Sequence, residues 1–248
     1  MMSKVISVFS VTGGAGTSLT AAALALSFSS MGKSVVVAET GRLSQTGQAG
    51  FGRSQDLLLD ADGVYNFGDL LEGKASPEQV AVKSRIPGDT DAGVRVLLSP
   101  AHGSVSGLIN GAEHFNKILA QLSAKHDIIL FDTAFEFIPF FLKQSDLGLL
   151  VTGVGLKEQR DCAGIGRNLN HNGKVRLILN NLDSKLPEGS IDLDETIDRI
   201  GIRLIGILPK QKSLLTLNGA LKLEGSFKKA AGNICRRILG KQVPLLFK

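Results

Sequence analysis

The sequence predicts an α/β fold: a single domain with a mostly parallel, doubly wound sheet flanked by helices. Short, continuous apolar runs recur along the 248 residues and are separated by helix-compatible segments. That pattern is typical of strands that are buried on both faces of a parallel sheet. Hydrophobic residues make up 43% and charged residues 21% of the chain, a balance that supplies a core and excludes a disordered protein. The length fits one domain over residues 1–248.

The first predicted elements are a strand, a glycine turn and a helix. Residues 5–11 are β-branched and apolar, three glycines follow within 13–16, and residues 19–31 are rich in Ala, Leu and Ser. Further buried strands are expected at 33–38, 94–98, 127–131, 147–151, 175–179 and 204–208. Helices are expected at 66–72, 76–83, 111–125, 157–170, 192–200 and 225–239.

Residues 41–63 contain five glycines and show little periodicity. We therefore predict a long loop that contains one helical turn. Loops of this length within compact domains often carry function.

The remaining composition excludes several classes of site. Cys162 and Cys235 are far apart and form no C-x-x-C motif, so neither a disulfide framework nor a cysteine-ligated metal is expected, and both are interpreted as plain helix residues. The histidines have no paired spacing with carboxylates or cysteines; they are His102, His114, His126 and His171. The N-terminal residues run straight into the glycine turn and are interpreted as a core strand rather than a signal peptide. No apolar run approaches the length of a membrane span. A cytoplasmic protein is expected, or one that lies at the inner face of a membrane.

Positive charge is concentrated in the last thirty residues. Residues 219–248 carry seven Lys or Arg and one Glu, a net charge of +6, whereas the whole chain carries +5. A basic C-terminal helix and tail is therefore expected over residues 225–248. A helix packed on the sheet with a solvated basic face explains this pattern as well as a binding surface does.

The segment Thr12–Ser18, TGGAGTS, lies between the first predicted strand and helix. A glycine loop in this position can cradle phosphates with its backbone N–H groups and the helix N-terminus. By its spacing the segment resembles the deviant Walker A loop of the MinD/ParA family of P-loop ATPases, which is written K-G-G-x-G-K-[ST]. A tight turn between a strand and a helix also requires small residues when it binds no ligand, so the glycines alone do not establish a phosphate site.

The resemblance extends over nearly the whole chain. Glu39–Gly41 follows the second strand, where the family has its first switch segment, and residues 127–133 (DIILFDT) resemble the Walker B strand. Three further segments resemble family motifs: residues 65–73 (YNFGDLLEG), residues 178–181 (ILNN), and residues 205–209 (IGILP) with Asn218-Gly219.

This resemblance implies ATP or ADP with Mg²⁺ as cofactor. It implies nucleotide contacts from Gly13, Gly14, Ala15, Gly16, Thr17, Ser18, Asn180 and Pro209. It implies magnesium contacts from Ser18 and Asp132, and switch roles for Glu39, Gly41, Asp132 and Glu136. The residues themselves are equally compatible with no cofactor, because Asp132 and Asn180 are also ordinary residues at the ends of strands.

The chain departs from the family pattern at the positions that carry catalysis. Thr12 replaces the signature lysine, which in the family reaches the phosphates of a dimer partner, and Thr17 replaces the Walker lysine. Gly41 stands where the second aspartate of the first switch segment is expected. A charge-assisted hydrogen bond contributes roughly 1.5–3 kcal/mol, so the loss of two lysines weakens phosphate binding by about 3–6 kcal/mol. Arg42 or Arg53, in the glycine-rich region, could substitute.

The sequence therefore predicts a positioning or assembly protein of MinD/ParA type, with weak or no ATP hydrolysis and no assigned catalytic residue. Its expected partners are a protein of a polar or membrane-associated machinery and a second copy of the chain. One alternative is an active ATPase that dimerises with Mg-ATP. Another is a DNA or membrane adaptor that uses Lys228, Lys229, Arg236 and Arg237, with residues 243–248 as the candidate membrane segment.

Overall fold

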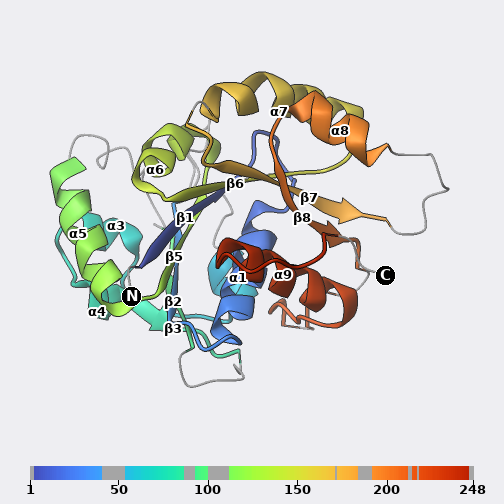
Figure 1. Cartoon of the computed structure of the whole chain (residues 1–248). Helices are drawn as coiled ribbons and strands as arrows, with labels where there is room; N and C mark the ends of the chain where they lie inside the picture. Colours follow the sequence, from blue (N-terminus) through green and yellow to red (C-terminus); the bar gives the residue numbers. More distant parts are fainter. Residues whose placement is uncertain are drawn as a thin grey trace.

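Among the residues that the structure describes, eight strands form one sheet in the order β3-β4-β2-β5-β1-β6-β7-β8 (Figure 1). The computed structural model describes residues 3–40, 54–86, 93–99, 112–170, 172–183, 192–211, 214–216 and 218–245. Neighbouring strands are parallel except for β3 and β4, which are antiparallel. The predicted fold class, a mostly parallel sheet flanked by helices, is confirmed.

The strands are β1 Lys4–Phe9, β2 Val35–Glu39, β3 Ala81–Lys83, β4 Val94–Leu97, β5 Ile128–Thr133, β6 Leu147–Thr152, β7 Val175–Leu182 and β8 Leu204–Pro209. The helices are α1 Thr17–Ser29, α2 Ser54–Leu58, α3 Phe67–Leu71, α4 Pro77–Val80, α5 Ala112–Lys125, α6 Ile138–Gln144, α7 Leu156–Leu169, α8 Leu193–Ile200 and α9 Gly225–Ile238. A 3₁₀ turn, η2 Phe135–Phe137, precedes α6.

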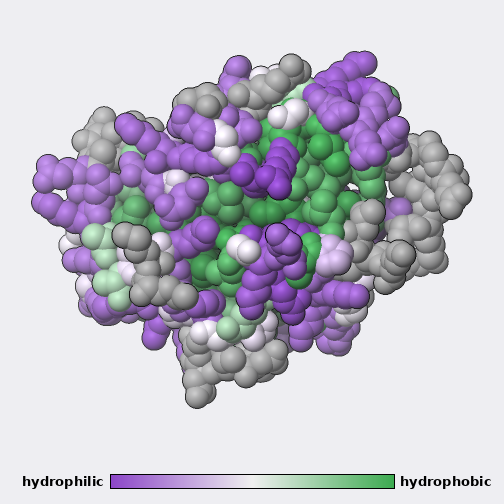
Figure 2. All heavy atoms as spheres, viewed as in Figure 1, coloured by the Kyte–Doolittle hydropathy of each residue, from purple (hydrophilic) through white to green (hydrophobic). Residues whose placement is uncertain are grey.

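Helices cover both faces of the sheet because successive strand residues point to opposite sides. In β1, Ile6 and Val8 pack in one cluster with α1 and α9, whereas Val5 and Phe9 belong to the clusters formed with α5 to α8. All four side chains are buried. Figure 2 shows the result in one view: hydrophobic residues fill the band along the sheet, and hydrophilic residues lie outside them on the helices.

The predicted strands correspond closely to the observed ones, but two segments differ. The helix expected at 76–83 ends at Val80, and Ala81–Lys83 instead forms the short antiparallel edge strand β3 against β4. Pairing with an exposed sheet edge outweighs the local helical preference there. Helix α6 was not predicted; its Phe141 packs in the aromatic cluster with Phe115 and Phe131.

Helix α9 packs on the same face as α1, as part of the core. Its predicted apolar face is buried and comprises Phe227, Ala230, Ala231, Ile234 and Ile238. Cys235 in α9 and Cys162 in α7 are also buried, and burial raises the pKa of both thiols. The interpretation of both cysteines as helix residues is confirmed.

Within the described ranges, no helix combines the length and the apolar character that crossing a membrane requires.

Candidate functional site

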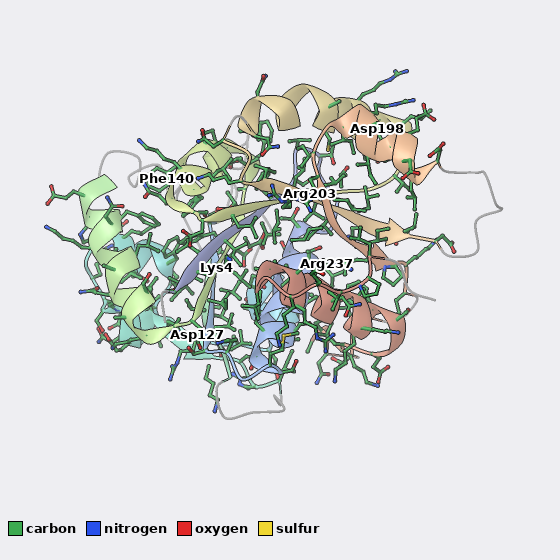
Figure 3. The ribbon with its side chains drawn as sticks, viewed as in Figure 1. Lys4, Asp127, Phe140, Asp198, Arg203 and Arg237 are labelled. Carbon is green, nitrogen blue, oxygen red and sulfur yellow. The ribbon has the colours of Figure 1, made fainter. Side chains whose placement is uncertain are left out.

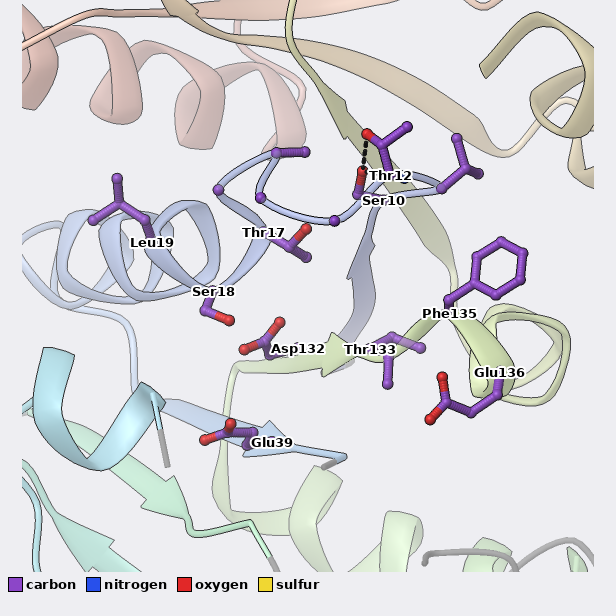
Figure 4. A pocket seen from close by; sticks show the side chains of 16 residues that line it. Ser10, Thr12, Thr17, Ser18, Leu19, Glu39, Asp132, Thr133, Phe135 and Glu136 are labelled. Atoms are coloured by element: carbon purple, nitrogen blue, oxygen red, sulfur yellow. Dashed lines mark hydrogen bonds between the residues drawn. The ribbon is translucent and has the colours of Figure 1, made fainter. Parts of the chain in front are cut away.

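The glycine loop and the carboxyl ends of β1, β2 and β5 enclose a cavity of about 390 Å³. Ligands of open α/β sheets bind at this edge of the strands. The cavity is lined by residues 10–19, Glu39 and residues 132–136. Figure 4 shows Ser18 on α1 and Asp132 at the end of β5 pointing toward one another across it. The structure therefore brings Ser18, Glu39, Asp132 and Glu136 to the lining of one cavity.

The backbone of the loop fits a phosphate group. Gly14 and Gly16 have φ values of 78° and 86°, the left-handed region that favours glycine. Helix α1 then begins without a side-chain cap and without an acidic residue in its first turn. Its first N–H groups are left for an anion, and the helix dipole favours negative charge there.

The side chains around the cavity are less suited to a phosphate. Thr12 turns toward Ser10: its backbone N–H donates to Ser10 Oγ at 3.1 Å, and the two hydroxyl oxygens are 3.4 Å apart (Figure 4). The described lining residues include the carboxylates of Glu39, Asp132 and Glu136 but no lysine or arginine. The predicted substitutes Arg42 and Arg53, and the switch residue Gly41, lie outside the described residues.

Gln55 of α2 bridges the two sides of the site. Its Nε2 donates to the backbone carbonyl of Ser18 and to Asp132 Oδ2, both at 2.9 Å. Its backbone N–H donates to Glu39 Oε2 at 3.0 Å. Gln55 is fully buried, and its Oε1 has no hydrogen-bond partner. One residue thus connects the glycine loop with both predicted switch strands.

The residues that would hold Mg²⁺ are Ser18 and Asp132, whose oxygens suit the cation chemically. One oxygen of the Asp132 carboxylate, Oδ2, accepts a hydrogen bond from the Gln55 side-chain amide. No group of three or more potential metal-ligating His, Cys, Asp or Glu side chains occurs among the described residues.

Thr40 joins the two switch strands directly. Its backbone N–H and its Oγ1 donate to the carbonyl oxygen of Asp132 at 3.1 and 3.2 Å, and the N–H of Ala134 donates to Thr40 Oγ1 at 2.9 Å. Sequence reasoning assigned no role to Thr40 or Gln55. For Gln55 a signal existed: it has helical spacing with Leu58 and Leu59, both buried, which predicts an inward-facing amide.

A second hollow, of about 310 Å³, lies beside the glycine loop and is lined by Asn180, Asn181 and Pro209 among others. The predicted base-contacting residues therefore lie next to the predicted phosphate loop. Asn180 also donates from Nδ2 to the carbonyl oxygen of Ala15 at 2.8 Å. In the structure, the Asn180 side chain therefore forms a hydrogen bond with the glycine loop itself.

One residue of the predicted basic surface is engaged elsewhere. The Arg237 guanidinium donates to the backbone carbonyls of Ile205 at 2.6 Å, Val243 at 3.1 Å and Pro244. Figure 3 shows Arg237 between α9 and β8. Partial burial lowers the pKa of its guanidinium. Arg237 therefore fastens the chain after α9, which corrects its expected role on a surface for DNA or membrane. Lys228, Lys229 and Arg236 are exposed, as predicted.

Comparisons with known proteins agree with the fold. No protein-family model matches the chain. The septum site-determining protein MinD of Synechocystis sp. is 29% identical over 262 residues, which cover 99% of this chain and 92% of that protein. The MinC:MinD cell division protein complex of Aquifex aeolicus gives a TM-score of 0.78 at 21% identity, with 99% of each chain covered. MinD of Pyrococcus horikoshii OT3 complexed with Mg-ADP gives a TM-score of 0.73 at 21% identity, with 96% of each chain covered.

Proposed function

Since the chain is a homologue of the MinD/ParA family of P-loop ATPases, we propose that it is a spatial-positioning or assembly protein with a degenerate nucleotide site. In this proposal it acts by binding protein partners, and it hydrolyses ATP weakly or not at all. One observation carries the proposal: Thr12 and Thr17, which line the cavity at the glycine loop, stand where the family has its signature lysine and its Walker lysine.

Electrostatics explain why the replacement of both lysines opposes hydrolysis. Phosphoryl transfer depends on positive charge aimed at the transferring group. The Thr12 and Thr17 hydroxyls line the cavity and carry no charge. The glycine backbone and the helix dipole remain as the attraction for a phosphate, which supports weak binding of ADP or ATP and no useful turnover.

Exposed apolar side chains support partner binding at the same edge of the sheet. Phe135, which lines the cavity, is 54% exposed, and Leu156, which begins α7 just after β6, is 62% exposed. Large exposed apolar residues at one edge favour a protein contact. The partner we propose is a protein of a polar or membrane-associated machinery, or a second copy of the chain bound through this face.

A second candidate function rests on the exposed cations of α9. Lys228, Lys229 and Arg236 line a hollow of about 570 Å³ between α9 and α1, and they could bind an anionic surface of DNA or lipid. Such binding would weaken steeply with salt. Measuring the binding of duplex DNA and of anionic vesicles at rising salt tests it, and equal binding by a K228E/K229E variant would contradict it.

Calorimetric titration with ADP and ATP plus Mg²⁺ tests the main proposal. The natural chain should bind neither nucleotide below millimolar concentrations. The T12K/T17K variant should gain about a hundredfold or more in affinity, since each lysine adds a charge-assisted hydrogen bond. N116K/Q121K, which places two lysines at exposed positions of α5, controls for the added net charge. Tight binding with hydrolysis by the natural chain, abolished by substitution of Thr17, would contradict the proposal.

A further inference from the structure

A hollow lined by cations lies at the edge of the sheet opposite the glycine loop. It has a volume of about 680 Å³ and is formed by the starts of β7 and β8, the end of α9 and the segment that follows α9. No Asp or Glu lines it among the described residues. We call it the arginine hollow, after the cations that four parts of the chain contribute: Arg176, Arg203, Arg237 and Lys241.

Arg176 and Arg203 lie opposite one another on neighbouring strands. Leu177 of β7 pairs with Leu204 of β8, and the N–H of Leu177 donates to the carbonyl oxygen of Arg203 at 2.9 Å. The residues one position earlier, Arg176 and Arg203, therefore share a register position. Backbones of neighbouring strands are about 4.8 Å apart, and like charges at such spacing repel. The pair therefore opposes folding unless an anion lies between the two guanidinium groups.

Backbone carbonyls orient two of the guanidinium groups without neutralising them. Arg176 donates from Nη1 to the carbonyls of Gly173 at 2.6 Å and Val175 at 2.8 Å. Arg237 donates to three carbonyls around the end of α9, and Figure 3 shows it below Arg203 in that view. Within the described part of the chain, none of the four cations forms an ion pair. The hollow thus holds positive charge that has no counter-ion there.

The lining fits a phosphate group that is attached to an apolar body. Guanidinium groups bind phosphate oxygens bidentately, and one dianionic phosphate presents enough oxygens for two opposed arginines. The volume lies within the range of about 300–1,000 Å³ that is typical of small-molecule sites. Apolar side chains line the rest of the hollow and would contact the organic body: Leu204, Ile205, Val243, Pro244 and Leu245.

We propose that the arginine hollow binds a soluble phosphate monoester with an apolar body, and that Arg176 and Arg203 hold its phosphate group. This site is separate from the glycine loop and goes beyond the function proposed above. A bound phosphate removes the repulsion between the two arginines, so the ligand stabilises the folded chain.

Calorimetric titration of the whole chain with phenyl phosphate, in the absence of Mg²⁺, tests the proposal. The natural chain should show one saturable site with a Kd below about 1 mM. Inorganic phosphate lacks the apolar body and should bind about tenfold more weakly. R203Q should weaken the binding of phenyl phosphate about tenfold or more, and R203E should abolish it. R160Q and R160E, at an exposed position of α7, should leave the affinity unchanged.

A variant of the glycine loop separates the two phosphate sites. T17E places a carboxylate at the cavity of that loop, and it should leave the binding of phenyl phosphate unchanged. Loss of binding in T17E together with full binding by R203E would overturn the inference and assign the phosphate to the glycine loop. The proposed function fails on a different result, which is tight nucleotide binding with hydrolysis by the natural chain.

Thermal unfolding at low salt provides a second measurement. R203E should raise the Tm above that of R203Q, because the new carboxylate faces Arg176 in register. Phenyl phosphate should raise the Tm of the natural chain and leave that of R203E unchanged. An R203E chain that is less stable than R203Q, or one that phenyl phosphate still stabilises, would overturn the inference.

A lipid headgroup could supply the same phosphate chemistry, so vesicles that contain phosphatidic acid are compared with free phenyl phosphate. Equal sedimentation of the natural chain and R203E with these vesicles, combined with loss of phenyl phosphate binding in R203E, supports the soluble ligand. Binding to the vesicles that R203E removes, with no binding of phenyl phosphate in solution, would overturn the inference in favour of a membrane surface.

Discussion

Asn180 Nδ2 donates to the carbonyl oxygen of Ala15 at 2.8 Å, joining the end of β7 to the glycine loop across 165 residues of sequence. Asn180 is 6% exposed. A Cβ atom added at Gly16 would lie 2.2 Å from the same Nδ2. The predicted base-contacting residue is therefore also a structural support of the loop, and it requires glycine at position 16.

Removing this support should loosen the loop. N180A deletes the donor to Ala15, and we expect it to lower the free energy of unfolding by about 1–2 kcal/mol, because a partly buried carbonyl loses its partner. Denaturant unfolding measures the change, and hydrogen exchange of the first α1 amides should quicken. N116A, on the exposed face of α5, should change stability by less than about 0.5 kcal/mol. Equal effects of the two variants would refute the role of the contact.

A larger side chain at position 206 should destabilise the fold because α9 packs against β8. A Cβ atom there would lie 2.3 Å from Ile234 Cγ1, so G206A should destabilise the fold by about 1–3 kcal/mol through overpacking. Gly164 in α7 has no neighbour within 4 Å of such an atom, and G164A should stabilise by about 0.5–1 kcal/mol through helix propensity. Thermal unfolding compares the pair; a stable G206A protein would show that α9 can move away.

Arg237 should hold the segment that follows α9. R237A removes the donors to Ile205, Val243 and Pro244, and we expect a loss of about 1–3 kcal/mol together with faster proteolysis after residue 240. R236A removes the neighbouring exposed arginine and should leave the cleavage rate unchanged. Identical cleavage of both variants would contradict the anchoring role.

Acid should destabilise the fold in part through His126. Burial lowers its pKa from the ordinary 6.5, and the charges of Arg95 and Lys125 act in the same direction. The unfolded state therefore takes up a proton first as the pH falls, so this residue's effect is a loss of stability as the pH falls below about 6.5, the ordinary pKa of the unfolded imidazole. H126Q should flatten the pH dependence of the free energy of unfolding in that window. H114Q, at an exposed position of α5, should leave it unchanged; an unaltered slope in H126Q would disprove the assignment.

Much of the fold could be predicted because buried parallel strands are apolar on both faces. The runs at 127–131 and 147–151 were recognised in this way and overlap β5 and β6. Strand β3 could not be recognised, since Ala81–Lys83 depends on the edge of β4 for its hydrogen bonds. Helix α6 was missed because its Phe141 gains its aromatic partners, Phe115 of α5 and Phe131 of β5, from outside the segment itself.

Residue order is enough to predict the alternation of strands and helices, the glycine loop, and the threonines at positions 12 and 17, because each depends on neighbouring residues. The folded structure was needed to find that Gln55 donates to Asp132, that Asn180 supports Ala15 and that Arg237 holds the C-terminal segment. These hydrogen bonds join residues that are distant in sequence, and they form only because the packing of the sheet brings the partners together. Local sequence patterns indicate burial and backbone preference, but they do not determine which donor and which acceptor form a hydrogen bond.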